Sequence, residues 1–292
     1  MTHGRADIHR LLDDHDLRPS RALGQNFVAD ANTVRRIVRL AGVVPGQAVV
    51  EVGAGLGSLT LALVEAGALV TEVEIDRHVL PALREQVEPL GVRVVEADAL
   101  TLDWDELLDK GTKGGPAGDP GHGGTWSLVA NLPYNVAVPL VVRVLEEAPR
   151  VASLLVMVQR EVGERLAAGP GAEAYGAVSV KVAYWARASV VGRVPASVFI
   201  PRPKVESVLV RLDRHDPTGP PPAGTEGVPY ERLFTVVRAG FAHRRKMLRG
   251  SLAGLVAPAA FEATGIRPTA RAEELGLEEW GRLAGWVEAS TP

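Results

Sequence analysis

The chain has 292 residues, of which 46% are hydrophobic and 23% are charged, and its formal net charge at pH 7 is −3. This length can form one large domain and a smaller one, and the negative net charge excludes a uniformly basic surface, so binding to a polyanion would depend on local basic patches. No apolar run reaches the roughly 18 residues that cross a membrane, and the first residues, MTHGRAD, carry no signal-peptide pattern. The chain has no cysteine and its seven histidines are scattered, so we expect a cytoplasmic protein without disulfides or a bound metal.

The first motif in chain order is a glycine loop. The apolar run 49–52 leads into Gly53, Gly55 and Gly57, and a helical pattern of apolar residues follows. A strand, a turn and a helix in this order are typical of a nucleotide-binding loop, because only glycine lets the backbone approach a ligand closely. The dinucleotide fingerprint G-x-G-x-x-G is not met, since its last position holds Ser58. Taken alone, the loop leaves a generic Rossmann dehydrogenase as the alternative.

Acidic residues follow the next two apolar runs. The run 68–73 is followed by Glu74, 21 positions after Gly53, and the run 92–96 is followed by Asp98. Ligands of an open α/β sheet bind at the carboxyl ends of its strands. Gly, Glu and Asp at three successive strand ends suit an adenosine, because a carboxylate accepts hydrogen bonds from ribose hydroxyls and from the adenine amine.

A fourth apolar run, 126–130, ends in Asn131-Leu132-Pro133-Tyr134. The side-chain oxygen of Asn131 and the carbonyl of Leu132, whose direction the proline ring fixes, are two hydrogen-bond acceptors. Two acceptors suit an exocyclic NH₂ group, and the attached base can stack on the ring of Tyr134. A polar turn after a strand is the alternative explanation, since Asn and Pro are common turn residues.

Two segments rich in glycine and proline divide the chain. We expect residues 110–124 to form a flexible loop and residues 216–227 to form a linker between domains. Before the linker, apolar runs alternate with helical patterns, which predicts a mostly parallel sheet wrapped by helices; after it the pattern is helical. The sequence therefore predicts an α/β catalytic domain over 1–215 and a helical domain over 228–292. Further strands are expected at 151–158 and 207–212, and helices at 31–42, 58–67, 77–88, 136–148, 229–243, 245–256, 259–264, 271–275 and 277–289.

The helical part carries a basic segment. Residues 231–250 contain six basic residues against one acid, Glu231, which gives a net charge of +5. Basic residues gathered on an amphipathic helix pair favour binding to nucleic-acid phosphates. Two alternatives remain: a solvated helix face, or ion pairs inside the small domain with Glu273, Glu274, Glu278 and Glu279.

Together these segments resemble the S-adenosylmethionine-dependent adenine N6-dimethyltransferases of ribosomal RNA, and among them the KsgA/RsmA family of the bacterial small subunit. The resemblance also rests on LGQNFV at 23–28, VPASVFIPRPKVES at 194–207 and FAHRRKMLR at 241–249, and it runs from about residue 18 to 290. It implies a Rossmann-like methyltransferase domain with a smaller, all-helical C-terminal domain. Val28 stands where leucine is commoner in the family, and we expect no effect because the implied contact is through the backbone.

The resemblance also implies the chemistry and its residues. The cofactor is S-adenosylmethionine, and the reaction is N6-dimethylation of two adjacent adenines in the 3′-terminal hairpin loop of 16S rRNA, in the immature 30S subunit during ribosome biogenesis. The implied cofactor contacts are Asn26, Val28, Gly53, Gly55, Glu74, Asp98 and Asn131. The implied catalytic residues are Asn131, Leu132, Pro133, Tyr134 and Phe199, with Phe199 as the second stacking face, and the implied rRNA contacts are Arg244, Arg245, Lys246 and Arg249.

Two rival functions stay open at this point. The nearer is an Erm-type adenine N6-methyltransferase of 23S rRNA, which shares the cofactor motifs; the FAHRRKMLR and LGQNF segments favour the small-subunit enzyme. The more distant is a non-catalytic RNA-binding assembly or transcription factor, against which the intact Asn131-Leu132-Pro133-Tyr134 and Glu74 argue. We expect a monomer.

Overall fold

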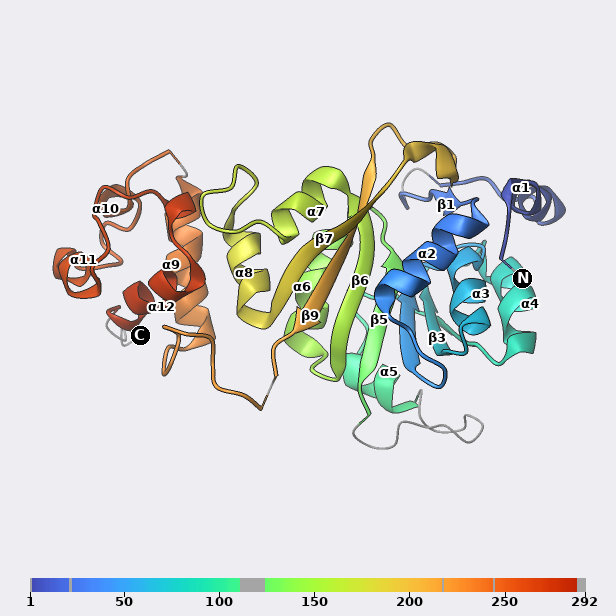
Figure 1. Cartoon of the computed structure of the whole chain (residues 1–292), viewed down its shortest axis with the longest axis horizontal. Helices are drawn as coiled ribbons and strands as arrows, with labels where there is room; N and C mark the ends of the chain where they lie inside the picture. Colours follow the sequence, from blue (N-terminus) through green and yellow to red (C-terminus); the bar gives the residue numbers. More distant parts are fainter. Residues whose placement is uncertain (1, 21–22, 111–123, 217, 244, 288–292) are drawn as a thin grey trace. The chain divides into compact units, whose positions relative to one another are not determined.

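The computed structural model describes residues 2–20, 23–110, 124–216, 218–243 and 245–287 (Figure 1). The chain folds into two compact units. Unit 1 comprises Met1–Gly163 and Ala188–Arg214, and unit 2 comprises Glu164–Arg187 and His215–Pro292. The flexible loop expected at 110–124 lies almost entirely outside the described residues.

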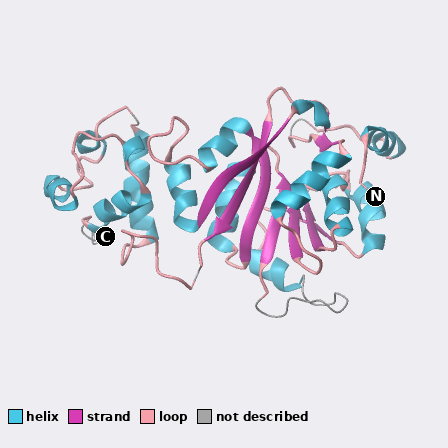
Figure 2. Ribbon diagram, viewed as in Figure 1, coloured by secondary structure: helices cyan, strands magenta, loops and turns pink. Residues whose placement is uncertain are grey.

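Unit 1 is built on a seven-stranded sheet in the order β4-β3-β2-β5-β6-β9-β7, drawn in magenta in Figure 2. Strands β2 to β6 pair in parallel, and β9 runs antiparallel to β6. The central strands are rich in apolar, β-branched residues because a parallel sheet is covered on both faces. The strands are Ala48–Val52 (β2), Leu69–Glu74 (β3), Arg93–Glu96 (β4), Trp126–Asn131 (β5), Val151–Gln159 (β6), Ala186–Val194 (β7) and Ser207–Arg214 (β9).

Helices cover this sheet and close its core. Ile37, Leu63 and Leu83, one from each of α2, α3 and α4, are buried in one hydrophobic cluster with Val49 of β2. Burying large aliphatic side chains of this kind stabilises a fold by roughly 1.5–3 kcal/mol each. The helices of unit 1 after the first are Ala31–Ala41 (α2), Ser58–Glu65 (α3), Leu80–Val87 (α4), Trp104–Lys110 (α5) and Ala137–Glu147 (α6), and Arg160–Leu166 (α7) leads into unit 2.

A short ribbon brings two distant segments together. Strand β1, Phe27–Val28, pairs antiparallel with β8, Phe199–Ile200, so that Val28 lies opposite Phe199. The first helix, Arg5–Asp14 (α1), packs its buried residues against this ribbon. The ribbon therefore fixes the segment that precedes α2 beside the segment that precedes β9.

Unit 2 is helical and has its own core. Phe234 and Trp280 are buried in one cluster with residues from all of its longer helices. Gly240 of α9 faces the Trp280 ring so closely that a Cβ there would lie 2.4 Å from it, which requires glycine at this crossing. The helices are Ala177–Trp185 (α8), Tyr230–Ala242 (α9), Leu248–Ser251 (α10), Pro258–Thr264 (α11) and Leu277–Gly285 (α12), with a short 3-10 turn at Ala272–Glu274.

The predicted fold class is confirmed, and the differences are local. The helix expected over 245–256 is reduced to α10, and no element is predicted for β7, whose side chains do not alternate cleanly between buried and exposed. Residues 164–187 precede the expected linker, yet they group with unit 2. The reason is packing: Tyr175 and Val180 are buried in the core of unit 2, and the Tyr175 hydroxyl donates to the Leu275 carbonyl at 2.8 Å.

Candidate functional site

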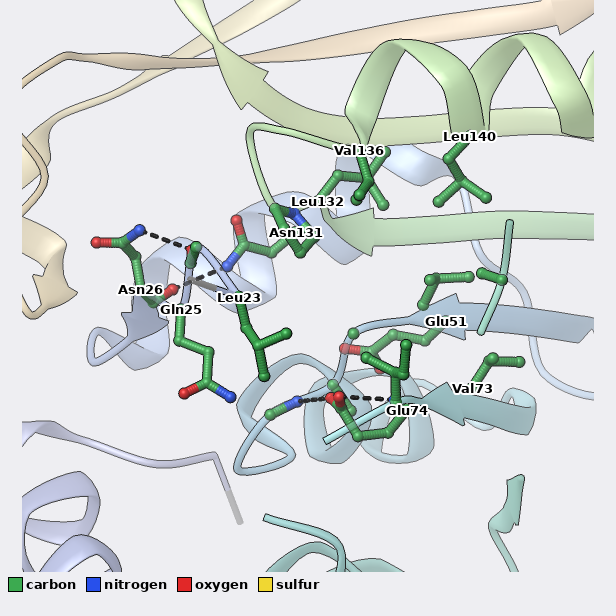
Figure 3. Close-up of a pocket in the computed structure, with 18 of the residues that line it drawn as sticks. Leu23, Gln25, Asn26, Glu51, Val73, Glu74, Asn131, Leu132, Val136 and Leu140 are labelled. Atoms are coloured by element: carbon green, nitrogen blue, oxygen red, sulfur yellow. Dashed lines mark hydrogen bonds between the residues drawn. The ribbon is translucent and has the colours of Figure 1, made fainter. Parts of the chain in front are cut away.

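One pocket of unit 1 gathers the strand-end motifs (Figure 3). It lies at the carboxyl ends of β2, β3 and β5, where a sheet of this kind binds ligands. Segment 23–28 completes the lining from outside the sheet. The expected site residues that line the pocket are Asn26, Val28, Gly53, Gly55, Glu74, Asp98, Asn131, Leu132, Pro133 and Tyr134.

The glycine loop between β2 and α3 takes a backbone conformation that side chains disfavour. Gly53, Gly55 and Gly57 have φ angles of 75°, 57° and 79°, in the left-handed region. At Gly55 space is also lacking, since a Cβ would lie 2.7 Å from the ring of Phe27. The loop therefore lies against β1 and leaves its backbone open to the pocket.

Glu74, the last residue of β3, holds this loop. Its Oε2 accepts from the Gly55 N–H at 3.0 Å, and its Oε1 accepts from the N–H groups of Ile75 and Asp76 at 2.9 Å each. Burial raises the pKa of the Glu74 carboxyl above its ordinary value, and these backbone donors oppose the rise. A carboxylate has about four acceptor positions, so one position on Oε2 remains for a ligand.

Asn131 is oriented by a residue far away in the sequence. Its Nδ2 donates to the carbonyl oxygen of Asn26 at 3.0 Å, and the Asn26 side chain donates to the carbonyl of Gly24 at 2.9 Å, as the dashed lines of Figure 3 mark. Because the amide nitrogen is engaged, Oδ1 of Asn131 is the atom left to accept, and no described residue donates to it. The Leu132 N–H donates to the carbonyl of Met157, which fixes the turn after β5.

Two further hydrogen bonds tie the pocket walls together. Gln25, which the motifs did not single out, donates to Oδ2 of Asp76 at 2.6 Å and connects segment 23–28 to the end of β3. Asp98 accepts from the Leu100 N–H at 2.8 Å, so part of its acceptor capacity is taken locally. The LGQNF motif was the signal that could have identified Gln25.

The two aromatic residues expected to hold a base lie differently. Tyr134 lines the pocket, and its hydroxyl lies 3.2 Å from Oγ of Ser207 at the start of β9. Phe199 is 1% exposed and belongs to the hydrophobic core. It does not line the pocket in this structure, and its ring packs in the core beside Val28.

The basic segment belongs to unit 2. Arg245, Lys246 and Arg249 are exposed and make no ion pair with any residue that the structure describes, while Arg244 lies outside the described residues. Two of the acids expected as alternative partners are engaged elsewhere, since Glu274 pairs with Arg267 at 2.7 Å and Glu278 pairs with Arg282 at 3.0 Å. The three cations are therefore available to an external anion.

The described part of the chain holds neither a metal cluster nor a membrane span. No group of three or more His, Cys, Asp or Glu side chains within it is placed to hold a metal ion. No helix within it is both long enough and apolar enough to cross a membrane.

The arrangement defines a class of protein. A seven-stranded sheet with five parallel strands, a glycine loop after a central strand and an acidic residue at the end of its neighbour is the fold of S-adenosylmethionine-dependent methyltransferases. A solved structure, the 23S rRNA methyltransferase ErmE, is 26% identical to this chain and superposes with a TM-score of 0.65 over 90% of this chain and 100% of that one.

The comparisons also give the family. The chain matches the model of the ribosomal RNA adenine dimethylase family over residues 17–289 and belongs to that family. Two relatives named ribosomal RNA small subunit methyltransferase A are 47% identical (Leifsonia xyli, 96% of this chain and 97% of the relative) and 46% identical (Streptomyces coelicolor, 96% and 95%). The protein is thus an rRNA adenine dimethyltransferase that uses S-adenosylmethionine, and the comparisons favour the small-subunit function over the Erm-type alternative.

Proposed function

We propose that the protein dimethylates N6 of two adjacent adenines in the 3′-terminal hairpin loop of 16S rRNA, on the immature 30S subunit, during ribosome biogenesis in the cytoplasm. The observation that carries the proposal is the Asn131–Asn26 hydrogen bond of 3.0 Å, which leaves Oδ1 of Asn131 and the Leu132 carbonyl as acceptors at the pocket. The small-subunit methyltransferase names of relatives that are 46–47% identical support the choice of rRNA.

The pocket fits the cofactor on two observations. Gly53 and Gly55 line the pocket without a side chain, so the backbone of the loop can lie directly against a ligand, and Glu74 keeps one open acceptor position for a ribose hydroxyl. Bound S-adenosylmethionine supplies an electrophilic methyl group. The residues that would hold it are Asn26, Val28, Gly53, Gly55, Glu74, Asp98 and Asn131.

The residues after β5 act on the target amine. The lone pair of adenine N6 is delocalised into the ring and is a poor nucleophile. When both N6 hydrogens are held by Oδ1 of Asn131 and the carbonyl of Leu132, the nitrogen is favoured in a more tetrahedral form, and the positive charge that develops on it is offset. Because the methylated nitrogen is acidic, it loses its proton to water without a general base. These residues also align the amine for in-line attack.

The target base leaves its stack to enter the pocket, and an aromatic face holds it there. Tyr134 supplies this face, with its ring anchored by the hydroxyl contact to Ser207. Phe199 as the second face requires its ring to leave the hydrophobic core, and this role stays a prediction. Base stacking on one ring stabilises binding by about 1–3 kcal/mol, which is comparable with the cost of unstacking.

The experiment that tests this function maps the modified nucleotides. Immature 30S particles and 50S subunits are incubated separately with the protein and S-adenosylmethionine, and their rRNA is digested and analysed by mass spectrometry. We expect N6,N6-dimethyladenosine at two adjacent positions of 16S rRNA only. Modification of 23S rRNA alone would contradict the proposal and favour the Erm-type function; no modification with either particle, by protein that binds the cofactor, would favour an assembly factor.

A further inference from the structure

Two buried carboxyl groups lie side by side on β2 and β3, and one of them, Glu51, lines the pocket. Glu51 of β2 and Glu72 of β3 are register partners in the parallel pair, so both side chains leave the same face of the sheet. They are 1% and 0% exposed. Glu51 lines the pocket, and Figure 3 shows it on the strand beside Glu74, which lies two residues after Glu72 and therefore on the same face.

The surroundings of this pair contain no described cation. Helix α3 contributes the hydroxyl of Thr60, and the residue opposite Glu72 on β4 is Val94. On the side of β5, Val50 pairs with Leu128, so the neighbour of Glu51 is the apolar Val129. The other charged group that acts on the pair is the carboxyl of Glu74, which has the same sign.

One more titratable group approaches the same helix. Nδ1 of His3 lies 3.5 Å from Oγ of Ser58 in the first turn of α3. Burial lowers the pKa of His3 below its ordinary value, so this imidazole is neutral near pH 7 and does not compensate the carboxyls.

Both oxygens of Glu72 and Oε2 of Glu51 are buried, and the donors that face the pair are the backbone N–H of Ala54, toward Glu72, and the hydroxyl of Thr60, toward Glu51. A proton held between the two carboxyl groups supplies the hydrogen bond that joins them. Burial raises the pKa of Glu72 well above its ordinary range and that of Glu51 to about 7, and the two like charges in contact oppose each other's ionisation. The pair therefore holds both protons below neutral pH, loses the first of them near pH 7 and keeps the second to higher pH.

We propose that the Glu51–Glu72 pair makes the pocket select the positively charged cofactor over its neutral product, and that cofactor binding expels the proton held by the pair. S-adenosylmethionine carries a sulfonium, whereas S-adenosylhomocysteine carries an uncharged thioether in the same skeleton. A positive charge in a pocket lined by Glu51 stabilises the ionised form of the pair, because Coulomb attraction is strong away from bulk water. One proton passes to solvent as one positive charge enters, so the net charge of the site is conserved. The proposal does not depend on which rRNA is methylated.

The pH dependence follows from the sign of this linkage. Below about pH 7 the free pair holds the proton of Glu51, and the cofactor must displace it; above about pH 7 that proton is already lost. The affinity for S-adenosylmethionine, relative to that for S-adenosylhomocysteine, therefore rises with pH. For one proton whose pKa falls from near 7 to below 6 on binding, the rise from about pH 6 to about pH 8 is about ten-fold.

The test is calorimetric titration of the full-length protein with each ligand at about pH 6, 7 and 8, in two buffers of different ionisation enthalpy. We expect the wild type to release up to one more proton with S-adenosylmethionine than with S-adenosylhomocysteine. In Glu72→Gln this difference and the roughly ten-fold pH dependence of relative affinity should both diminish. The ligands' own amino groups titrate identically in both proteins, so the comparison isolates the pair. Glu65→Gln, at the exposed end of α3, is the matched control and should behave as the wild type.

Two results would overturn the proposal. The first is a folded Glu72→Gln variant that releases as many protons as the wild type. The pair would then have a purely structural role, and its loss would change only the melting temperature. The second needs no variant: infrared difference spectra of the wild type at about pH 6.5 should show loss of a protonated-carboxyl band on addition of S-adenosylmethionine and not of S-adenosylhomocysteine. The same spectral change with both ligands, or with neither, would contradict the selection.

Discussion

Nδ2 of Asn131 donates to the main-chain carbonyl of Asn26 at 3.0 Å, across 105 residues of sequence. The acceptor is a backbone atom next to the β1–β8 ribbon, so the orientation of the Asn131 amide, for which we propose a catalytic role, depends on how segment 23–28 packs. A primary amide has one oxygen and one nitrogen, and engaging the nitrogen aims the oxygen. The LGQNF and NLPY segments therefore act as one unit, which explains why both carry the resemblance to the family.

The first prediction concerns this amide. Asn131→Ala should reduce turnover by about 10²–10³-fold, because one preorganised acceptor for the charge developing on N6 is lost. The affinity of the variant for rRNA should change far less, since the amide makes one hydrogen bond to a large substrate. Single-turnover methylation and filter binding of the same particles measure the two effects. Asn32→Ala, an exposed asparagine on α2, is the control. A loss of rRNA affinity that matches the loss of turnover would contradict the catalytic role.

The second prediction concerns Glu74. Glu74→Gln should weaken cofactor binding by roughly 10–100-fold, because the ligand loses a charged acceptor worth about 1.5–3 kcal/mol. The glutamine also cannot accept at both ends, so the bonds to the Gly55, Ile75 and Asp76 N–H groups cannot all persist. Calorimetric titration measures the affinity, with Glu88→Gln, an exposed carboxyl after α4, as control. Unchanged affinity in Glu74→Gln would mean that the ribose binds elsewhere.

The third prediction separates backbone strain from crowding in the glycine loop. Gly55→Ala places a Cβ 2.7 Å from the Phe27 ring at a φ of +57°, whereas Gly91→Ala places one in open space at a φ of +84°. Each substitution carries the left-handed penalty of roughly 1–2 kcal/mol, so the difference between them removes this shared penalty and leaves the effect of a Cβ in the glycine loop. We expect Gly55→Ala to lose cofactor binding and Gly91→Ala to keep it, as calorimetric titration would measure. Equal cofactor affinities in the two variants would show that cofactor binding does not depend on the close packing and open backbone of the loop at Gly55.

The sequence predicts those parts of the site that are local in the chain. Apolar runs followed by Gly53, Glu74, Asp98 and Asn131 place each residue at a strand end, and in a parallel sheet all strand ends meet at one edge. The pocket lining agrees with these placements because each depends only on where a strand stops. The helical character of the chain after residue 228 is equally local, being fixed by apolar spacing.

What the sequence does not predict depends on register and packing between distant segments. The contact of Glu51 with Glu72 follows from the pairing of β2 with β3, which no local pattern specifies. Glu74 was expected to accept hydrogen bonds from ribose hydroxyls, and the structure shows that most of its acceptor capacity already holds backbone N–H groups. The burial of Phe199 follows in the same way from its pairing with Val28 across the ribbon. In each case the sequence predicts the chemical character of the residue but not which residues surround it in the fold.

The last prediction separates recognition of rRNA from chemistry. Arg245→Glu with Lys246→Glu should weaken particle binding and reduce the slope of log affinity against log salt by roughly 1.5–2, because two phosphate contacts and their released counterions are lost. Cofactor affinity should not change, since the pocket residues belong to unit 1. The melting temperature should also hold, because neither side chain makes an ion pair with a described residue.

The matched control reverses the charge of two arginines that are paired within the same unit. Arg267→Glu with Arg282→Glu breaks the ion pairs to Glu274 and Glu278, so any effect should appear in the melting temperature and leave the salt slope nearly unchanged. Both double variants change the net charge by the same amount, so a general electrostatic effect would lower the two slopes equally. Equal salt slopes in the two double variants would therefore contradict specific binding of rRNA phosphates by the 245–249 segment. Because phosphate contacts position a nucleic acid without specifying its sequence, the Arg245→Glu, Lys246→Glu variant should methylate the same adenines, only at higher particle concentration.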